Sequence, residues 1–212
     1  MDKKYKLTEE TIKVEGSILY RIEALQDFSD VKQGDKGGYV EKEENLSQSG
    51  DCWIYDNAMA YGNSQVYDDA KVYGNAVVYG DTIVCGSAKI YGNAVVCDDA
   101  EVYDNAVVHG EAQVYGHALV YGNMEIYGNT WVYGDAEVYD DAKVFGSAKI
   151  FGDAQVYGDT LVCDNAQIYG KAAVHDDAVV CDNAIVCDNA EVYEDAVVCG
   201  DMVICGNAVV YD

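Results

Sequence analysis

Aliphatic side chains recur at every sixth position from residue 54 to residue 210. These 27 positions run from Ile54 to Val210 without an insertion, and Ala60 is the one small exception. Four residues after each of them stands a small residue, usually Ala. Self-similarity at a short fixed period indicates a repeat architecture, in which each unit buries its apolar side chains against its neighbours. The chain is therefore predicted to stack many copies of one short unit.

Each unit reads small, variable, aliphatic, and then aromatic or Cys, followed by two corner residues. The first four positions alternate as in a short β-strand, whose successive side chains point to opposite faces. The variable position often carries a charge, as at Lys71, Glu101 and Lys143, and an unpaired buried charge is costly. This position is therefore predicted to face outward, together with the aromatic position of the same parity. Ala and the aliphatic residues are left to form the core.

The two corner positions mostly hold Gly, Asp, Asn or Ser, as at Gly74 and Asn75. These residues tolerate a positive φ or bond to their own backbone, so they favour sharp turns. Four-residue strands with a corner after each are too short for useful hairpins and must pair with the next layer of a coil. The predicted fold class is all-β, a parallel β-solenoid.

The repeat resembles the hexapeptide repeat of left-handed parallel β-helix proteins, the acyltransferase-type solenoids. The resemblance implies left-handed winding, three hexapeptides in each 18-residue triangular coil, and about nine coils. At about 4.8 Å for each layer, these coils would make a rod roughly 43 Å long. This chain departs from the family after the aliphatic residue, where the family often has Gly and this chain has Tyr, Cys, Phe or His.

Residues 19–62 are similar to the opening of the YdcK-like proteins, a bacterial and phage group of hexapeptide solenoids. The segments DFSDV, GGYV and LSQSGDCWIYDNA carry this resemblance. Upstream, YKLTEE and ILYRIEAL flank a turn at Gly16 and predict two strands that cover one end of the solenoid. The expected domains are an N-terminal β cap over residues 1–50 and a hexapeptide-repeat β-helix over residues 51–212. Members of the group are called transferases by analogy, which does not establish an activity.

The composition is acidic, with a formal net charge of −25. Proteins that bind nucleic-acid phosphates need clustered Lys and Arg, so no direct nucleic-acid binding is expected. The chain has no apolar run as long as a membrane span, and its N-terminus lacks the apolar core of a secretion signal. We therefore expect no membrane contact and a cytoplasmic location.

An acyltransferase, the activity that the family resemblance implies, needs a His as general base near an acyl carrier. His109 and His175 replace Tyr in the surface pattern, and His117 is a corner residue. The repeat lacks the loops that shape a pocket in such enzymes, and a smooth prism offers no concave site for a small molecule. We expect no catalytic residue and no cofactor, with an acyltransferase-like enzyme as the alternative.

Cysteines fall in vertical columns when the coil has 18 residues. Cys163, Cys181 and Cys199 share one column, and Cys187 and Cys205 share a second. Neighbours about 4.8 Å apart are within disulfide range. The columns contain no Cys-x-x-Cys pair, and stacked thiols give poor tetrahedral geometry for a metal. We expect free exposed thiols and no metal, with column disulfides or intermolecular bridges as the alternative.

Aromatic residues stack in columns in the same way, and one column contains Tyr103, Tyr121, Tyr139 and Tyr157. Offset stacking stiffens the solenoid. Tyr also makes good contact surfaces because it is amphipathic and loses little entropy on binding. These four residues, called the tyrosine ladder below, are the candidate surface for a protein or glycan partner.

Apolar residues occupy the outward variable position near the C-terminal end, in contrast to Glu125, Glu137 and Lys143 further back. An apolar surface beside an open sheet edge indicates association, although an outward Val also simply favours a strand. We expect self-association, side by side or end to end, through the last coils. The candidate residues are Val179, Ile185, Val197, Val203 and Val209.

Residues 54–212 contain 26 acidic residues and 5 lysines, a net charge of −21. Along the rod this is roughly one charge per 2 Å, near the ~1.7 Å of duplex DNA. An acidic DNA mimic that inhibits a nucleic-acid-binding protein is therefore a further alternative, although Asp and Asn also suit corners for conformational reasons. The favoured interpretation is a non-enzymatic, rigid structural or protein-binding solenoid of bacterial or phage origin.

Overall fold

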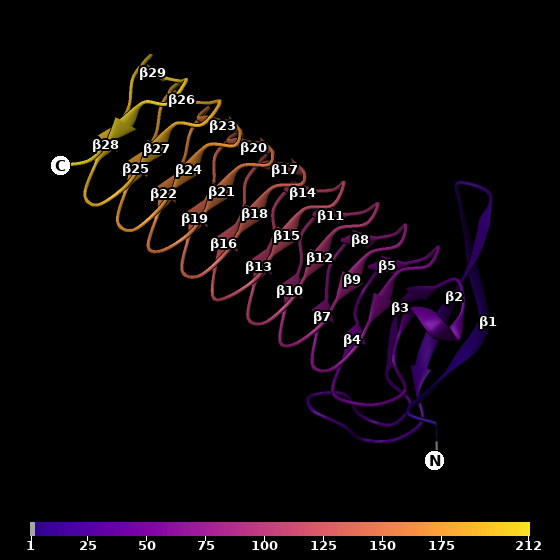
Figure 1. The fold of residues 1–212 in the computed structure, drawn as a ribbon. Coiled ribbons are helices and arrows are strands. Elements are labelled where there is room, and N and C mark those ends of the chain that lie inside the picture. The colour runs from indigo at the N-terminus through magenta and orange to yellow at the C-terminus, as the bar shows by residue number, and fades with distance from the viewer. Residues whose placement is uncertain (1–2) are drawn as a thin grey trace.

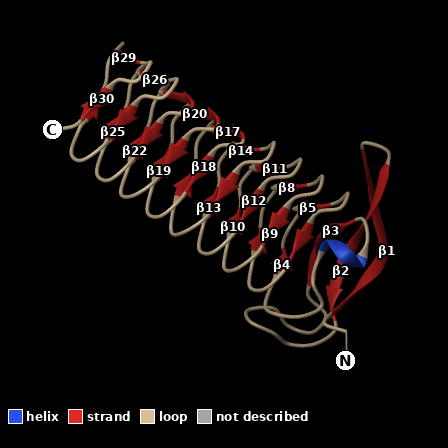
Figure 2. Cartoon of the chain, viewed as in Figure 1, coloured by secondary structure: helices blue, strands red, loops and turns tan. Residues whose placement is uncertain are grey.

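The computed structural model describes residues 3–212 and shows a parallel β-solenoid with antiparallel strands at its N-terminal end (Figure 1). The coils stack along one axis, and the two ends of the chain lie at opposite ends of the stack. The all-β prediction is confirmed, because the one helical segment within these residues is the short 3-10 helix η1 (Glu43–Asn45) (Figure 2). No helix in this part of the chain is long and apolar enough to cross a membrane.

Three sheets form the faces of the solenoid. The first sheet contains β1 (Tyr5–Val14), β2 (Ser17–Ala24), β3 (Lys36–Val40), β5 (Met59–Ala60), β8 (Val77–Val78), β11 (Val95–Val96), β14 (Gln113–Val114), β17 (Trp131–Gly134), β20 (Lys149–Gly152), β23 (Gln167–Gly170), β26 (Ile185–Val186) and β29 (Val203–Ile204). The second contains β4 (Trp53–Ile54), β7 (Lys71–Val72), β10 (Lys89–Ile90), β13 (Val107–Val108), β16 (Glu125–Ile126), β19 (Lys143–Val144), β22 (Leu161–Val162), β25 (Val179–Val180) and β28 (Val197–Val198). The third contains β6 (Gln65–Val66), β9 (Ile83–Val84), β12 (Glu101–Val102), β15 (Leu119–Val120), β18 (Glu137–Val138), β21 (Gln155–Val156), β24 (Ala173–Val174), β27 (Glu191–Val192) and β30 (Val209–Val210).

Each solenoid strand pairs in parallel with the strand 18 residues later, as Ile90 does with Val108 and Val108 does with Ile126. Three strands therefore complete one coil. The strand β3 pairs in parallel with β5, and a bridge joins Leu46 to Val66. These contacts add a first coil, so the solenoid has about ten turns instead of the predicted nine. Most strands span two residues, not the predicted four, because the chain bends on both sides of each pair.

The core consists of the small and the aliphatic positions, as predicted. Ala88 and Ile90 are fully buried, and so are Ala136 and Val138 further along the chain. Where Thr82 replaces Ala, its hydroxyl donates to the Tyr79 carbonyl at 2.6 Å, so the buried hydroxyl has a partner. The narrow interior is thus filled by short side chains from three faces. The variable side chains lie outside it, except that Trp53 is buried against Tyr5 and Phe28 of the cap.

Each corner begins with a residue of positive φ, usually Gly or Asp. Gly80 has a φ of 80°, and Asp98, at the same corner one coil later, has a φ of 62°. The Asp98 carboxylate accepts the amide N–H of Gly116 at 3.3 Å, and the Asn105 side chain donates to Asn123 at 3.0 Å. Corner acids and amides therefore join one coil to the next. This structural role accounts for Asp at corners without nucleic-acid mimicry.

The N-terminal cap is the predicted hairpin. Strands β1 and β2 pair antiparallel around a turn at Gly16, which has a φ of 96°, and β2 pairs with β3, so the cap continues into the first sheet. Lys4 is buried at this end, where its Nζ donates to the carbonyl oxygens of Gly50 and Cys52 at 3.2 and 2.9 Å. The same ammonium group lies 5.0 Å from the Phe28 ring centre. The buried ammonium group thus has hydrogen-bond acceptors at the first coil, which offsets the cost of its burial.

Candidate functional site

The tyrosine ladder is a stack of nearly parallel rings. The ring centroids of Tyr103 and Tyr121 are 4.9 Å apart at an interplanar angle of 1°, and those of Tyr121 and Tyr139 have the same values. Tyr139 and Tyr157 stack at 4.8 Å and 2°. Each ring follows a strand of the third sheet, so the 18-residue register fixes its position. The ladder forms a continuous aromatic strip on the outer surface.

The ladder tyrosines are outward but half-buried, because each ring covers its neighbours. Burial, followed by the neighbouring Tyr121, raises the pKa of Tyr103 to about 12. Burial also raises the pKa of Tyr139 to about 12. These phenols are therefore protonated at neutral pH and can donate hydrogen bonds to a partner.

His109 and His175 belong to the aromatic stacks, and each lies between two aromatic rings. The Nε2 atom of His109 lies 2.9 Å from a carboxylate oxygen of Glu125. His175 repeats this arrangement with Glu191 at 3.2 Å, and its Nδ1 lies 3.2 Å from Asp176. Both ring faces of each histidine are covered, and in His175 both ring nitrogens face carboxylates, which is a poor setting for a general base that must reach a substrate.

The solenoid surface is less smooth than the sequence suggested. A hollow of about 540 Å³ follows one corner edge near the C-terminal coils. Its lining consists of Gly158, Asp159, Asp176, Asp177, Glu194, Asp195 and Asp212. An acidic lining repels the phosphates of an acyl carrier such as coenzyme A. The exposed His117 pairs with Asp99 at 3.6 Å and does not line this hollow.

Cysteines form the two predicted columns. Cys163, Cys181 and Cys199 follow β22, β25 and β28, which are consecutive strands of the second sheet. Cys187 and Cys205 form a disulfide with Cα atoms 4.6 Å apart. The prediction of free exposed thiols is therefore wrong for this pair. It is also wrong on exposure, because all eight cysteines are buried or half-buried.

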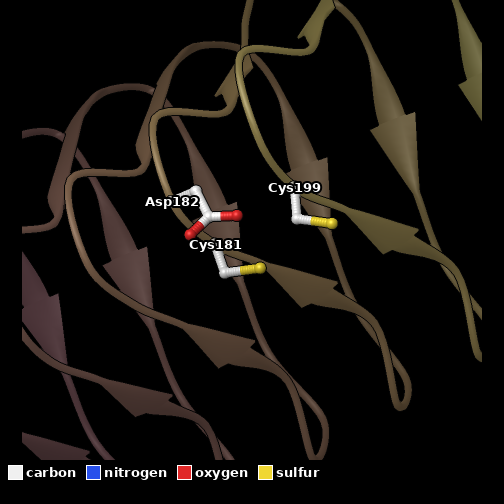
Figure 3. A group of neighbouring side chains, drawn as sticks. All are labelled: Cys181, Asp182 and Cys199. Carbon is white, nitrogen blue, oxygen red and sulfur yellow. The ribbon is translucent and has the colours of Figure 1, made fainter.

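Cys181, Asp182 and Cys199 form a compact cluster (Figure 3). Their sulfur atoms and a carboxylate oxygen all lie within 4.8 Å of one another. The Asp182 carboxylate also accepts the amide N–H of Gly200 at 2.9 Å. Burial, followed by a hydrogen bond with Cys199, raises the pKa of the Cys181 thiol to about 11. Sequence reasoning aligned the thiols but missed Asp182, although its position next to Cys181 was a usable signal.

The five candidate self-association residues do not form one patch. Val179 pairs with Val197 in the second sheet, Ile185 pairs with Val203 in the first, and Val209 lies in the third. Val197, Val203 and Val209 are 56%, 60% and 51% exposed, whereas Val179 and Ile185 are half-buried. The three exposed valines thus lie on three different faces of the solenoid, one in the last strand of each sheet.

A second hollow, which sequence reasoning did not single out, is lined in part by the outward side chain of Trp131. Trp131 and Lys149 pair across β17 and β20, and the lysine Nζ lies 4.8 Å from a ring centre of the indole. The Trp131 Nε1 is buried and has no hydrogen-bond partner among the described residues. The hollow has a volume of about 310 Å³. The 18-residue step, applied to Trp131, would have revealed its pairing with Lys149.

Comparisons with known proteins agree with this architecture. Residues 70–86 and 112–124 match a family described as the YdcK Beta solenoid repeat. A curated relative from Escherichia coli (strain K12), named "Uncharacterized acetyltransferase YdcK", is 41% identical over 68 residues. That alignment covers 28% of this chain and 21% of the relative, so the chain spans about a fifth of the length of the protein it matches. The chain is a parallel β-solenoid protein, two segments of which match the YdcK β-solenoid repeat.

Proposed function

We propose that the protein is a rigid structural or protein-binding solenoid and that the tyrosine ladder is its binding surface. The parallel stacking of the four outward rings carries this proposal. Rings held by neighbours on both sides have little rotational freedom left to lose, so a partner that covers them incurs a small entropic cost. Tyr supplies both apolar area and a hydrogen-bonding hydroxyl to such a contact.

The surroundings of the ladder favour a protein partner with a basic rim. Burial, followed by the carboxylates of Glu137, Asp140 and Asp104, raises the pKa of Tyr121. These acids therefore lie beside the aromatic strip. A complementary surface would place apolar or aromatic side chains over the rings and Lys or Arg over the carboxylates, since complementary charge gives specificity and speeds association.

A matched pair of ladder variants tests this proposal. Tyr121→Ser with Tyr139→Ser interrupts the ladder, and Tyr115→Ser with Tyr133→Ser removes an equivalent stack, at 4.9 Å and 1°, from another column. The two variants and the parent chain are immobilised, and the proteins that each captures from a cell extract are quantified by mass spectrometry. We expect a captured protein to be lost from the ladder variant and kept by the control. Equal capture by all three would reject the ladder as the binding surface.

We also propose that the chain self-associates through its last coils. The exposed side chains of Val197, Val203 and Val209, which lie on β28, β29 and β30, support this. Val→Lys at these three positions should shift the mass from light scattering toward one chain. Val107→Lys, at the variable position in the middle of the solenoid, is the control. A parent chain that is monomeric at micromolar concentration contradicts this proposal.

An acetyltransferase is the second candidate, and the printed name of the relative is the observation that favours it. The covered rings of His109 and His175 and the acidic hollow weigh against it. Isothermal titration with acetyl-CoA separates the two candidates. A rod without this activity gives no heat of binding, whereas saturable binding that His175→Gln abolishes would favour the enzyme.

A further inference from the structure

Two thiols and a carboxylate converge on the outside of the C-terminal coils. Figure 3 shows Cys181 and Asp182 on one coil and Cys199 on the next. Their ligand atoms all lie within 4.8 Å of one another. A tetrahedral ion that binds thiolates at about 2.3 Å holds its ligand atoms roughly 3.8 Å apart. Small side-chain rotations therefore suffice to bring these three groups onto one ion.

The ligand set has a definite chemical preference. Thiolates select soft or borderline ions such as Zn²⁺, whereas Mg²⁺ and Ca²⁺ prefer oxygen ligands alone. Three protein ligands and a water are a regular four-coordinate arrangement for Zn²⁺. The N–H of Gly200 holds the Asp182 carboxylate at 2.9 Å, and hydrogen bonds of this kind orient metal ligands. With Asp182 as third ligand, the tetrahedral coordination geometry no longer depends on the stacked thiols alone.

We propose that Cys181, Asp182 and Cys199 bind a thiophilic divalent cation, such as Zn²⁺ or Cd²⁺, with water at the fourth position. Binding replaces the two thiol protons, which pass to the solvent, so the affinity rises with pH. The net charge of −25 raises the concentration of cations at the surface of the protein. The carboxylate and the two thiolates then supply the selectivity for a soft ion.

A second cluster in the same coils provides a comparison. Cys187, Asp188 and Cys205 offer the same ligand set, but their sulfur atoms are joined in a disulfide and leave no thiolate. Cys85 occupies the same position of its unit as Cys181, yet its neighbours in the column are Tyr67 and Tyr103. Cys163, the third thiol of the column, lies one coil before Cys181 but belongs to no such cluster among the described residues. The proposed site therefore needs two free thiols and a carboxylate within reach of one another.

Cadmium titration of the full chain tests the site. The parent for this experiment carries Cys187→Ser and Cys205→Ser, so that only one paired column remains, and it is reduced and kept free of oxygen. We expect one Cd²⁺ per chain by native mass spectrometry, with sulfur-to-cadmium charge-transfer absorption in the near ultraviolet. Cys181→Ser or Cys199→Ser should abolish this absorption. Asp182→Asn should weaken binding by more than the roughly 10–100-fold that accompanies loss of a group that only orients a ligand.

Cys85→Ser and, within the same column, Cys163→Ser are the matched controls and should leave stoichiometry and affinity unchanged. Circular dichroism establishes that each variant is folded, and alkylation of the parent establishes that its thiols are free before metal is added. Cadmium binding by Cys181→Ser at the parental affinity would place the ion on surface carboxylates and overturn the proposal. Absence of binding to the parent with free thiols would overturn it as well.

Discussion

The ring of Tyr121 lies parallel to the ring of Tyr139, with centroids 4.9 Å apart and an interplanar angle of 1°. The separation equals the step between neighbouring strands of a sheet, about 4.8 Å. The backbone register therefore brings the two rings into contact without any displacement of either coil. Since Tyr121 has a second such neighbour in Tyr103, it sits within a continuous stack.

Truncation of Tyr121 should weaken the solenoid. Aromatic pairs contribute about 0.5–1.5 kcal/mol beyond their area burial, and this ring has two partners, so Tyr121→Ala should lower the free energy of unfolding by about 1–3 kcal/mol. Tyr121→Phe keeps both stacks and should have a much smaller effect. Urea unfolding followed by circular dichroism measures both values. An equal loss in the two variants would show that the hydroxyl, and not ring stacking, stabilises the ladder.

Two neighbouring corners should respond differently to the same substitution. Gly80 and Gly74 both have positive φ, at 80° and 67°. A Cβ on Gly80 would lie 2.7 Å from the Asp98 carbonyl oxygen, whereas the closest approach for Gly74 is 3.1 Å, to the Gly92 oxygen. Both Gly→Ala variants incur the strain of about 1–2 kcal/mol for a left-handed residue, and Gly80→Ala should lose clearly more. Thermal unfolding of the two variants measures the difference between their losses of stability. Equal losses would show that the next coil can shift to make room for the methyl group at Gly80, which would contradict this prediction.

The disulfide between Cys187 and Cys205 should stabilise the last coils. It closes a loop of 18 residues, for which the restriction of the unfolded chain corresponds to about 3 kcal/mol. Reduction should therefore lower the urea midpoint of the chain without substitutions. Cys187→Ser should already show the lower midpoint and should not respond to reductant. Alkylation of both thiols in protein purified without reductant would contradict the bridge.

The ladder should make the fold sensitive to alkali. The raised pKa values of Tyr103 and Tyr139, about 12 in the folded chain, exceed the value of about 10 in an unfolded chain. Their contribution to stability is therefore complete below pH 10 and is lost as the pH rises through 12. Tyrosinate absorption at alkaline pH should rise together with the loss of the β-sheet circular dichroism signal. Ionisation of all tyrosines near pH 10 with the fold intact would contradict this prediction.

Sequence periodicity predicted the parallel β-solenoid and its core, and the family resemblance supplied the number of units in each coil. Ile90 and Ala88 could be assigned to the core because each stands on the opposite strand face from a charged neighbour such as Lys89. The 18-residue register followed from the three units per coil that the family resemblance implied, and it aligned both the tyrosine ladder and the cysteine columns. The hairpin around Gly16 was predictable because its turn separates two alternating segments.

Side-chain detail depended on contacts that a period does not specify. The sequence predicted outward tyrosines, but their half-buried state arises from ring-on-ring contact between coils. It aligned Cys181 with Cys199 and Cys187 with Cys205 equally well, and it could not indicate that only the second pair is bridged. Lys4 gave no signal at all, because its burial depends on carbonyl groups almost fifty residues away.

The pairing of every solenoid strand with the strand 18 residues later has a consequence for how such a chain can change in evolution. Duplication of any 18-residue segment would lengthen the rod by one layer and leave every downstream side chain on its original face. Duplication of a single unit of six residues would instead move all later residues to the adjacent face and break each column in two. Insertions or deletions of 54 nucleotides therefore keep each side-chain column on its face, whereas those of 18 nucleotides move every later column to another face.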